Sequence, residues 1–325
     1  MKIKLLKYSF LVFLIFVSCG DDDDNGIIQV PEADRDEQQV IDNDSLLGYF
    51  QTHYINQSQL IGNLNIGLDE IIINELPDDG QLPNPSQNIL LSDLVETFTT
   101  TFSDTEYEYY IIKLNQGGSE SSPNFSDKVR VSYEGLLTDN TVFDSSPFPV
   151  DFDLTSTIAG WGRVLPEFNN AEDFIINSDG TVTYNNPGIG IMFLPSGLGY
   201  YSAAAGSVPV YSNLIFKFKI YQSEVNDHDF DNVPSHLEDL DGDYDLTDDN
   251  SDDDSFADFV DSDDDNDGTL TIDEDLEPDT DLTVDRDGDG DPTNDIGDGD
   301  PTNDDTDGDG IPNYLDPDNS ESRDD

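Results

Sequence analysis

Apolar and polar residues alternate over several short stretches of this chain, and a period of two is typical of β-strands with one buried face. In the stretch 129–135, Val129, Val131 and Tyr133 lie on one side, and polar residues lie on the other. The same alternation recurs in three further stretches, at 107–114, 150–154 and 214–220. We therefore expect residues 105–222 to form a β-rich domain.

The segment 40–104, before these strands, has a mixed pattern. Between Val40 and Ile55, apolar residues recur at helical spacing, which predicts a short amphipathic helix. The stretches 66–76 and 89–102 are rich in β-branched and aromatic residues, and we expect them to be strands that extend the sheet of the following domain. Residues 20–39 are polar and acidic without periodicity, as is typical of a tether.

Six short patterns follow one another in a fixed order between residues 129 and 216. They read V-x-V-x-Y-x-G, F-D-S-S, P-V-x-F-x-L, I-x-G-W, P-x-x-L-x-Y and V-P-x-x-x-x-L-x-F. In this order they resemble the FKBP-type peptidyl-prolyl cis-trans isomerases, over residues 105–222. The resemblance implies an α+β fold in which a twisted antiparallel β-sheet wraps over a short α-helix.

The resemblance also implies a cleft for a proline side chain. Trp161 would form its floor, and Val208 would close its rim. Asp144 and the hydroxyls of Tyr133 and Tyr200 would be its polar points, and the Ile158 backbone N–H would donate to the substrate carbonyl. The residues that the resemblance places in the site are Tyr133, Phe143, Asp144, Val150, Ile158, Trp161, Tyr200, Val208 and Phe216.

The activity implied is the isomerisation of prolyl bonds in proline-containing polypeptides. Rotation about a peptide bond makes and breaks no covalent bond, so it needs no nucleophile and no catalytic cofactor. Three features depart from the family: Val150 replaces an aromatic residue, Gly199 replaces an alanine, and an insertion at 169–187 would border the cleft. The same fold could instead serve a non-catalytic binder or chaperone.

Acidic residues greatly outnumber basic residues in this chain. The chain has 73 Asp and Glu but only 12 Lys and Arg, which gives a formal net charge of −61. Binding to a nucleic-acid backbone needs basic residues that displace counterions, so nucleic acid is not an expected partner. More than half of the acids follow Asp227, and we treat 223–325 as a separate acidic extension.

The acids of this extension are spaced as in calcium-binding loops, where alternate oxygens converge and a glycine at position 6 makes a sharp turn. The strongest match is the EF-hand pattern at 263–274, and the loop at 305–316 resembles thrombospondin type 3 repeats. A third loop, 227–238, has Asn232 in the glycine position. The predicted ligands are Asp263, Asp265, Asp267, Thr269 and Glu274; Asp305, Asp307, Asp309, Ile311 and Asp316; and Asp227, Asp229, Asp231 and Glu238.

These loops predict structural Ca²⁺ in an otherwise irregular segment. A disordered acidic tail is the simpler alternative, above all for 248–254. The octapeptide GDGDPTND occurs twice, at 288–295 and 297–304. A surface adhesion or dockerin-like protein, in which the calcium loops recognise a partner, is a further alternative function.

The first residues predict export. A basic start and a short apolar run, 10–17, are typical of a signal peptide, and residues 1–19 end in a sequence that resembles a lipobox. Lipidation is therefore expected at Cys19, the chain's single cysteine, which also excludes an internal disulfide. The acidic run that follows resembles an export signal of surface lipoproteins. We expect a monomeric, surface-exposed outer-membrane lipoprotein, with the periplasmic face as the alternative.

Overall fold

The computed structural model describes residues 32–60, 62–275, 300–320 and 322. The described residues from Ala33 onward belong to one compact unit. The predicted signal peptide, Cys19 and most of the predicted tether lie outside the described residues, as does the first octapeptide repeat. No helix in the described part of the chain has the length and apolar character needed to cross a membrane.

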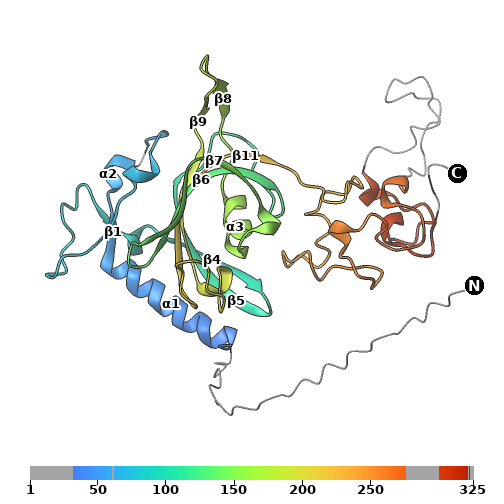
Figure 1. Ribbon diagram of the computed structural model, residues 1–325, viewed down its shortest axis with the longest axis horizontal. Coiled ribbons are helices and arrows are strands. Elements are labelled where there is room, and N and C mark those ends of the chain that lie inside the picture. Colours follow the sequence, from blue (N-terminus) through green and yellow to red (C-terminus); the bar gives the residue numbers. More distant parts are fainter. Residues whose placement is uncertain (1–31, 61, 276–299, 321, 323–325) are drawn as a thin grey trace, which may run out of the picture. The chain divides into compact units, whose positions relative to one another are not determined.

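The central element is a six-stranded sheet in which every neighbouring pair is antiparallel, in the order β4-β5-β10-β11-β6-β7. The antiparallel sheet predicted for 105–222 is therefore present, with a short helix packed against it (Figure 1). The elements of this region are β4 (Glu96–Phe102), β5 (Thr105–Asn115), β6 (Lys128–Leu137), β7 (Val142–Asp153), α3 (Ala159–Val164), β10 (Gly188–Leu194) and β11 (Leu214–Glu224).

Apolar cores cover both faces of this sheet. On one face, Trp161 and Val164 of α3 pack against alternate residues of β11, among them Phe216 and Phe218. On the other face, the helix α1 (Arg35–Thr52) buries its apolar side against β5 and β10 (Figure 1). Because β10 lies in the middle of the sheet with a core on each side, all seven of its residues are buried.

Helix α1 begins five residues before the predicted start at Val40. The carboxylate of Asp34 caps it by accepting a hydrogen bond from the Glu37 backbone N–H at 3.1 Å. Its first turns bury polar residues, including Asp42, and so lack the apolar spacing that identifies a helix from sequence. Asp42 anchors α1 to the domain, because its carboxylate accepts from the Ser196 backbone N–H at 2.8 Å and from the Ser196 hydroxyl at 2.5 Å.

Residues 40–104 extend the central sheet only in part. The last strand of this segment, β4, pairs with β5 as predicted. The other strands are very short, because proline-rich turns interrupt the segment, and they form a separate sheet in the order β2-β1-β3. Its elements are β1 (His53–Ile55), α2 (Gln57–Leu60), β2 (Ile73–Glu75) and β3 (Ile89–Leu90).

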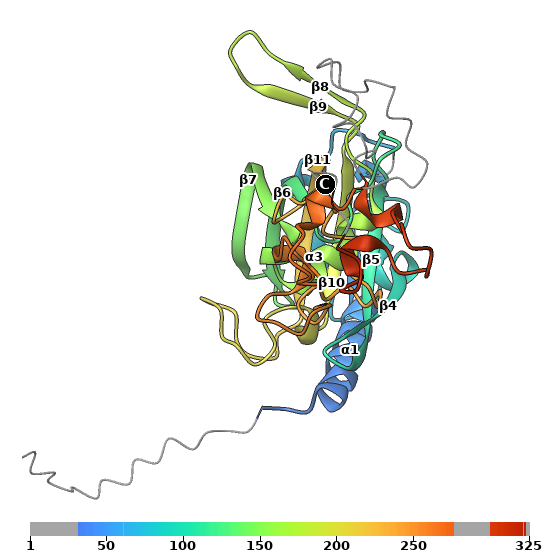
Figure 2. The ribbon, with the colours of Figure 1, turned by 90° about the vertical axis from the view of Figure 1, so that its right-hand side faces the viewer.

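The predicted insertion forms a hairpin of β8 (Asp173–Ile176) and β9 (Val182–Asn185), which projects from the sheet (Figure 2). Tyr184 stacks on Tyr221, with ring centroids 4.5 Å apart. Tyr221 lies five residues along β11 from Phe216. Since a strand rises by about 3.3 Å per residue, the hairpin meets β11 at the end away from Phe216, and we correct the expectation that it borders the predicted cleft.

The described parts of the acidic extension contain turns in place of long helices or strands, as predicted. Short 3₁₀ turns punctuate them, at Asp258–Val260, Thr271–Asp273, Pro301–Asn303 and Asn313–Leu315.

Candidate functional site

The structure brings the nine residues predicted for the cleft into one cluster, which we call the aromatic site. Phe216 lies at its centre, with its ring centroid 5.0 Å from that of Trp161 and 5.4 Å from that of Phe143. The Tyr133 ring lies 5.8 Å from that of Trp161. Val150, Ile158, Tyr200 and Val208 pack against the same core. The strands β6, β7 and β11, the helix α3 and the segment between β10 and β11 thus place these side chains together.

Burial divides the aromatic site into a floor and a wall. Trp161 and Phe216 are only 4% and 3% exposed, and Val208 is equally buried. Val208 is thus as buried as the floor, and its role in closing the rim stays a prediction. The side chains that keep part of their surface in contact with solvent are Phe143, Asp144, Val150, Ile158 and Tyr200.

The glycine of the V-x-V-x-Y-x-G pattern has a packing role. A Cβ atom on Gly135 would lie 2.7 Å from the Phe143 ring and 2.9 Å from the Phe216 ring. Any larger residue would therefore push apart two rings that contact each other. The close approach of backbone and rings explains why the pattern has a glycine at this position.

Two groups give the aromatic site its polar edge. The Tyr133 hydroxyl donates to Asp144 Oδ2 at 2.6 Å, while Asp144 Oδ1 accepts from the Ser145 backbone N–H at 2.8 Å. Burial and the Asp144 carboxylate raise the pKa of Tyr133, and burial followed by Asp144 raises that of Tyr200. Both phenols therefore remain protonated at neutral pH and can donate hydrogen bonds.

The backbone at Ile158 has the geometry of a helix N-cap. Its φ and ψ are −65° and 145°, and its carbonyl accepts from the Trp161 backbone N–H at 3.0 Å. The amide of an N-cap residue precedes the hydrogen bonds of its own helix. The predicted donor role of the Ile158 N–H toward a substrate carbonyl fits this position.

Sequence reasoning missed one ring of the aromatic site. Phe152 lies 5.7 Å from Trp161 and 5.3 Å from Tyr133, measured between ring centroids. The signal was present, because Phe152 follows Val150 at the strand period of two and so shares its face. Phe152 thus supplies an aromatic surface beside Val150, the position where the family's aromatic residue is replaced.

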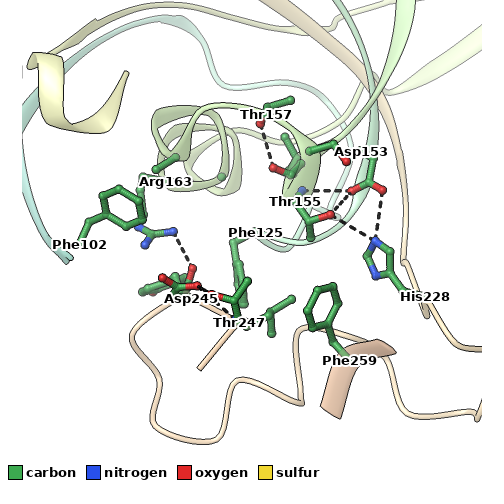
Figure 3. A pocket seen from close by; sticks show the side chains of 16 residues that line it. Phe102, Phe125, Asp153, Thr155, Thr157, Arg163, His228, Asp245, Thr247 and Phe259 are labelled. Atoms are coloured by element: carbon green, nitrogen blue, oxygen red, sulfur yellow. Dashed lines mark hydrogen bonds and ion pairs between the residues drawn. The ribbon is translucent and has the colours of Figure 1, made fainter. Parts of the chain in front are cut away.

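A separate cavity of about 530 Å³ lies on the other side of α3, between the isomerase-like domain and the acidic extension (Figure 3). Arg163 of α3 donates to the backbone carbonyls of Tyr244 and Asp243 at 3.1 and 3.2 Å. His228 Nε2 lies 3.2 Å from Asp153 Oδ2. The Arg163 contacts attach the extension to the helix that carries Trp161, and the His228 contact attaches it to the end of β7. The cavity is lined about equally by polar and apolar groups and by none of the nine predicted residues.

The acidic extension gathers its carboxylates into groups of three or four, with one oxygen from each side chain within 4.8 Å of the others. Two groups coincide with predicted loops 263–274 and 305–316, and a third draws three residues from loop 227–238. Two further groups were not predicted, although their acids also alternate along the chain. The groups are Asp263, Asp265 and Asp267; Asp305, Asp307 and Asp309; Asp229, Asp231, Glu238 and Asp264; Asp239, Asp241 and Asp249; and Asp252, Asp254 and Asp261.

The remaining predicted ligands lie outside these groups. Asp227 accepts hydrogen bonds from the backbone N–H groups of Phe230 and Asn232, at 2.7 and 3.2 Å. Asp316 accepts from the Asp318 N–H at 3.1 Å. Glu274 is fully buried, and burial together with Asp265 and Asp267 raises its pKa to about 9. These residues, and the backbone carbonyls of Thr269 and Ile311, stay predictions as ligands.

The sharp turns expected of the loops are present. Position 6 has a positive φ in each of them, at 80° for Asn232, 100° for Gly268 and 98° for Gly310. Glycine and asparagine enter this region more readily than other residues, so Asn232 can take the place of glycine.

Comparison with known proteins supports the resemblance over one part of the chain. Residues 119–221 match the family model of FKBP-type peptidyl-prolyl cis-trans isomerase. The chain is 30% identical to the FKBP-type peptidyl-prolyl cis-trans isomerase FkpA of Aeromonas hydrophila over 134 residues. These aligned residues cover 40% of this chain and 43% of that protein. It is 46% identical over 56 residues to the peptidyl-prolyl cis-trans isomerase Mip of Coxiella burnetii, 16% of this chain and 24% of that protein.

The crystal structure of FkpA from Escherichia coli aligns with a TM-score of 0.30 and 24% identity, over 39% of this chain and 51% of that one. The chain thus spans less than half the length of either curated relative. All nine predicted residues of the aromatic site fall within 119–221. This segment of the chain is therefore similar to the FKBP-type peptidyl-prolyl cis-trans isomerases.

Proposed function

We propose that this protein is a peptidyl-prolyl cis-trans isomerase of FKBP type that acts on proline-containing polypeptides of the cell envelope. The observation that carries the proposal is the convergence of nine residues, predicted from separate sequence patterns, on one aromatic site within the matched segment. Residues that only filled an ordinary core would not be expected both to follow the order of the family patterns in the sequence and to contact one another in the fold.

The aromatic site suits the physical problem of prolyl rotation. Amide resonance opposes the rotation with a barrier of roughly 18–20 kcal/mol. An apolar surface of rings strips water from the imide and so disfavours the charge-separated resonance form that makes the bond rigid. The phenol of Tyr200 and the Ile158 N–H then offer donors to the twisted amide, while the Tyr133 hydroxyl stays bonded to Asp144. Substrate binding and orientation suffice, because no bond is made or broken.

A proline-peptide assay tests this function. The full chain is expected to accelerate cis-trans isomerisation of a short peptide that contains one proline. Phe143→Ala removes a half-buried ring of the wall and should lower kcat/KM at least tenfold, since each factor of ten corresponds to about 1.4 kcal/mol of transition-state stabilisation. Phe174→Ala, on the exposed hairpin, is the matched control and should leave kcat/KM unchanged. Peptide binding without acceleration would instead identify a non-catalytic binder.

The acidic extension is proposed to bind Ca²⁺ as a structural ion. Its donors are carboxylate oxygens, which are the ligands that Ca²⁺ takes in proteins. Several of these oxygens are buried without a hydrogen-bond partner, for example both oxygens of Glu274. An ionised carboxylate in such a place is costly unless a cation compensates it. The groups of loops 227–238, 263–274 and 305–316 would hold the ions.

We further propose that Cys19 carries a lipid that anchors the protein in the outer membrane, exposed at the surface. The basic start, the apolar run and the residues before Cys19 support this proposal. Cells grown with a radiolabelled fatty acid should label the protein, and Cys19→Ser should abolish the label and release the chain from the membrane fraction. A Cys19→Ser chain that keeps its label would contradict lipidation at this cysteine.

A further inference from the structure

One carboxylate group of the extension joins two loops. Asp229, Asp231 and Glu238 come from the loop 227–238, whereas Asp264 comes from the loop 263–274. Asp264 occupies the second position of its loop, where no ligand is expected. Its carboxylate nevertheless leaves its own loop and reaches within 4.8 Å of the other three.

These carboxylates are buried and lack protein partners. Glu238 is 0% exposed and Asp264 is 1% exposed, and neither has a hydrogen-bond partner on either carboxylate oxygen. Both oxygens of Asp229 and one oxygen of Asp231 are likewise buried and unpaired. Burying four such carboxylates together is costly without a compensating positive charge, because desolvation and mutual repulsion act in the same direction.

The surroundings seal this group from solvent. Asp258 lies close by, but its own oxygens accept hydrogen bonds from the Ser251 N–H and hydroxyl, each at 2.8 Å. Tyr314, from the loop 305–316, is 3% exposed, and burial followed by Asp264 and Glu238 raises its pKa. Two loops therefore meet around one group of unpaired carboxylate oxygens.

We propose that Asp229, Asp231, Glu238 and Asp264 bind one Ca²⁺ ion that is shared between the first two loops, a site we call the interloop site. An all-oxygen, anionic ligand set of flexible geometry suits Ca²⁺ better than Mg²⁺, which demands a near-ideal octahedron and retains several waters. The shared ion ties together loops whose acids lie more than 25 positions apart, so its removal would separate them. This inference rests on the proposal that the extension binds calcium and adds a specific ligand that the loop pattern does not contain.

Counting bound ions in the full chain tests the interloop site. The chain is equilibrated with CaCl₂ and dialysed, and the bound calcium is measured by atomic absorption and by native mass spectrometry. Asp264→Asn and Glu238→Gln should each lower the count by one ion. The double variant should also lose one ion, not two, because both residues hold the same ion. Asp253→Asn removes an exposed acid between the loops, outside the carboxylate groups, and should keep the full count.

A fold control accompanies the count. In EDTA, Asp264→Asn should unfold at the same denaturant concentration as the unsubstituted chain or higher, because one buried charge has gone; in CaCl₂ it should unfold earlier. An unchanged ion count in Asp264→Asn, or two ions lost in the double variant, would overturn the interloop site while calcium binding stands. A chain that binds no calcium would overturn both, and the proline-peptide assay, which needs no ion, would still decide the isomerase proposal.

Discussion

Phe216→Ala is expected to lower kcat/KM for prolyl isomerisation by about 100-fold, which corresponds to about 2.7 kcal/mol of transition-state stabilisation. Phe216 is the ring that touches both the floor and the wall of the aromatic site, through Trp161 and Phe143. Its loss lets both neighbours move and admits water beside the imide. Because Phe216 is buried, the variant should also lose about 3–5 kcal/mol of stability.

The loss of stability makes a matched control necessary. Phe193 lies on β10 in the same sheet and is fully buried, but it faces the opposite core, where its ring lies 4.9 Å from that of Phe50. Phe193→Ala should cost a similar amount of stability yet leave kcat/KM of the folded protein within about twofold, measured well below the melting temperature. Equal loss of activity in the two variants would mean that rigidity of the sheet, and not the aromatic site, determines the rate.

Removal of calcium by EDTA is expected to loosen residues 225–275 and 300–320 while the six-stranded sheet stays folded. The extension contains five groups of clustered carboxylates in its described parts, and their repulsion would be uncompensated without cations. A ligand at 100 times its dissociation constant contributes about 2.7 kcal/mol per site. Amide hydrogen exchange in the loops should therefore accelerate at least 100-fold, as measured by mass spectrometry on peptides.

The sheet provides the internal reference for this experiment. Peptides from β10 and β11 should exchange at the same rate with and without EDTA, because their cores consist of apolar side chains. Adding MgCl₂ in place of CaCl₂ should restore little of the protection in the loops. Loop protection that is indifferent to EDTA would show that the extension is held by its protein contacts alone.

The aromatic site could be predicted because its residues recur at strand spacing within short, ordered patterns. Val129, Val131 and Tyr133 reveal a buried face by themselves, and the patterns around Phe143 and Trp161 specify which segments meet. The contribution of Phe152 follows from the same alternation, since Phe152 comes two positions after Val150. What the patterns could not show was how deeply each side chain is buried, for example that Val208 is as buried as Phe216.

Other features could not be predicted because their determinants lie far apart in the sequence or are polar. Asp42 is a buried carboxylate whose partner, Ser196, is 154 positions away. The first turns of α1 are therefore held by polar contacts distant in sequence, and no local apolar pattern marks where the helix begins. Asp264 lies between two regular ligand positions and acts across loops, which a spacing rule for single loops excludes. The separate β2-β1-β3 sheet likewise depends on the pairing of β1 with two strands that follow α2 in the sequence, and not on strand propensity.

The helix α1 has a practical consequence for anyone who trims this protein. The matched segment 119–221 lacks α1, β4 and β5. A fragment truncated to this segment would therefore expose the apolar face of β10 that carries Ile189, Ile191 and Phe193. The smallest excised fragment that keeps both sides of the sheet wrapped runs from residue 33 to residue 224. Expression of shorter pieces invites aggregation that would be mistaken for an inactive enzyme.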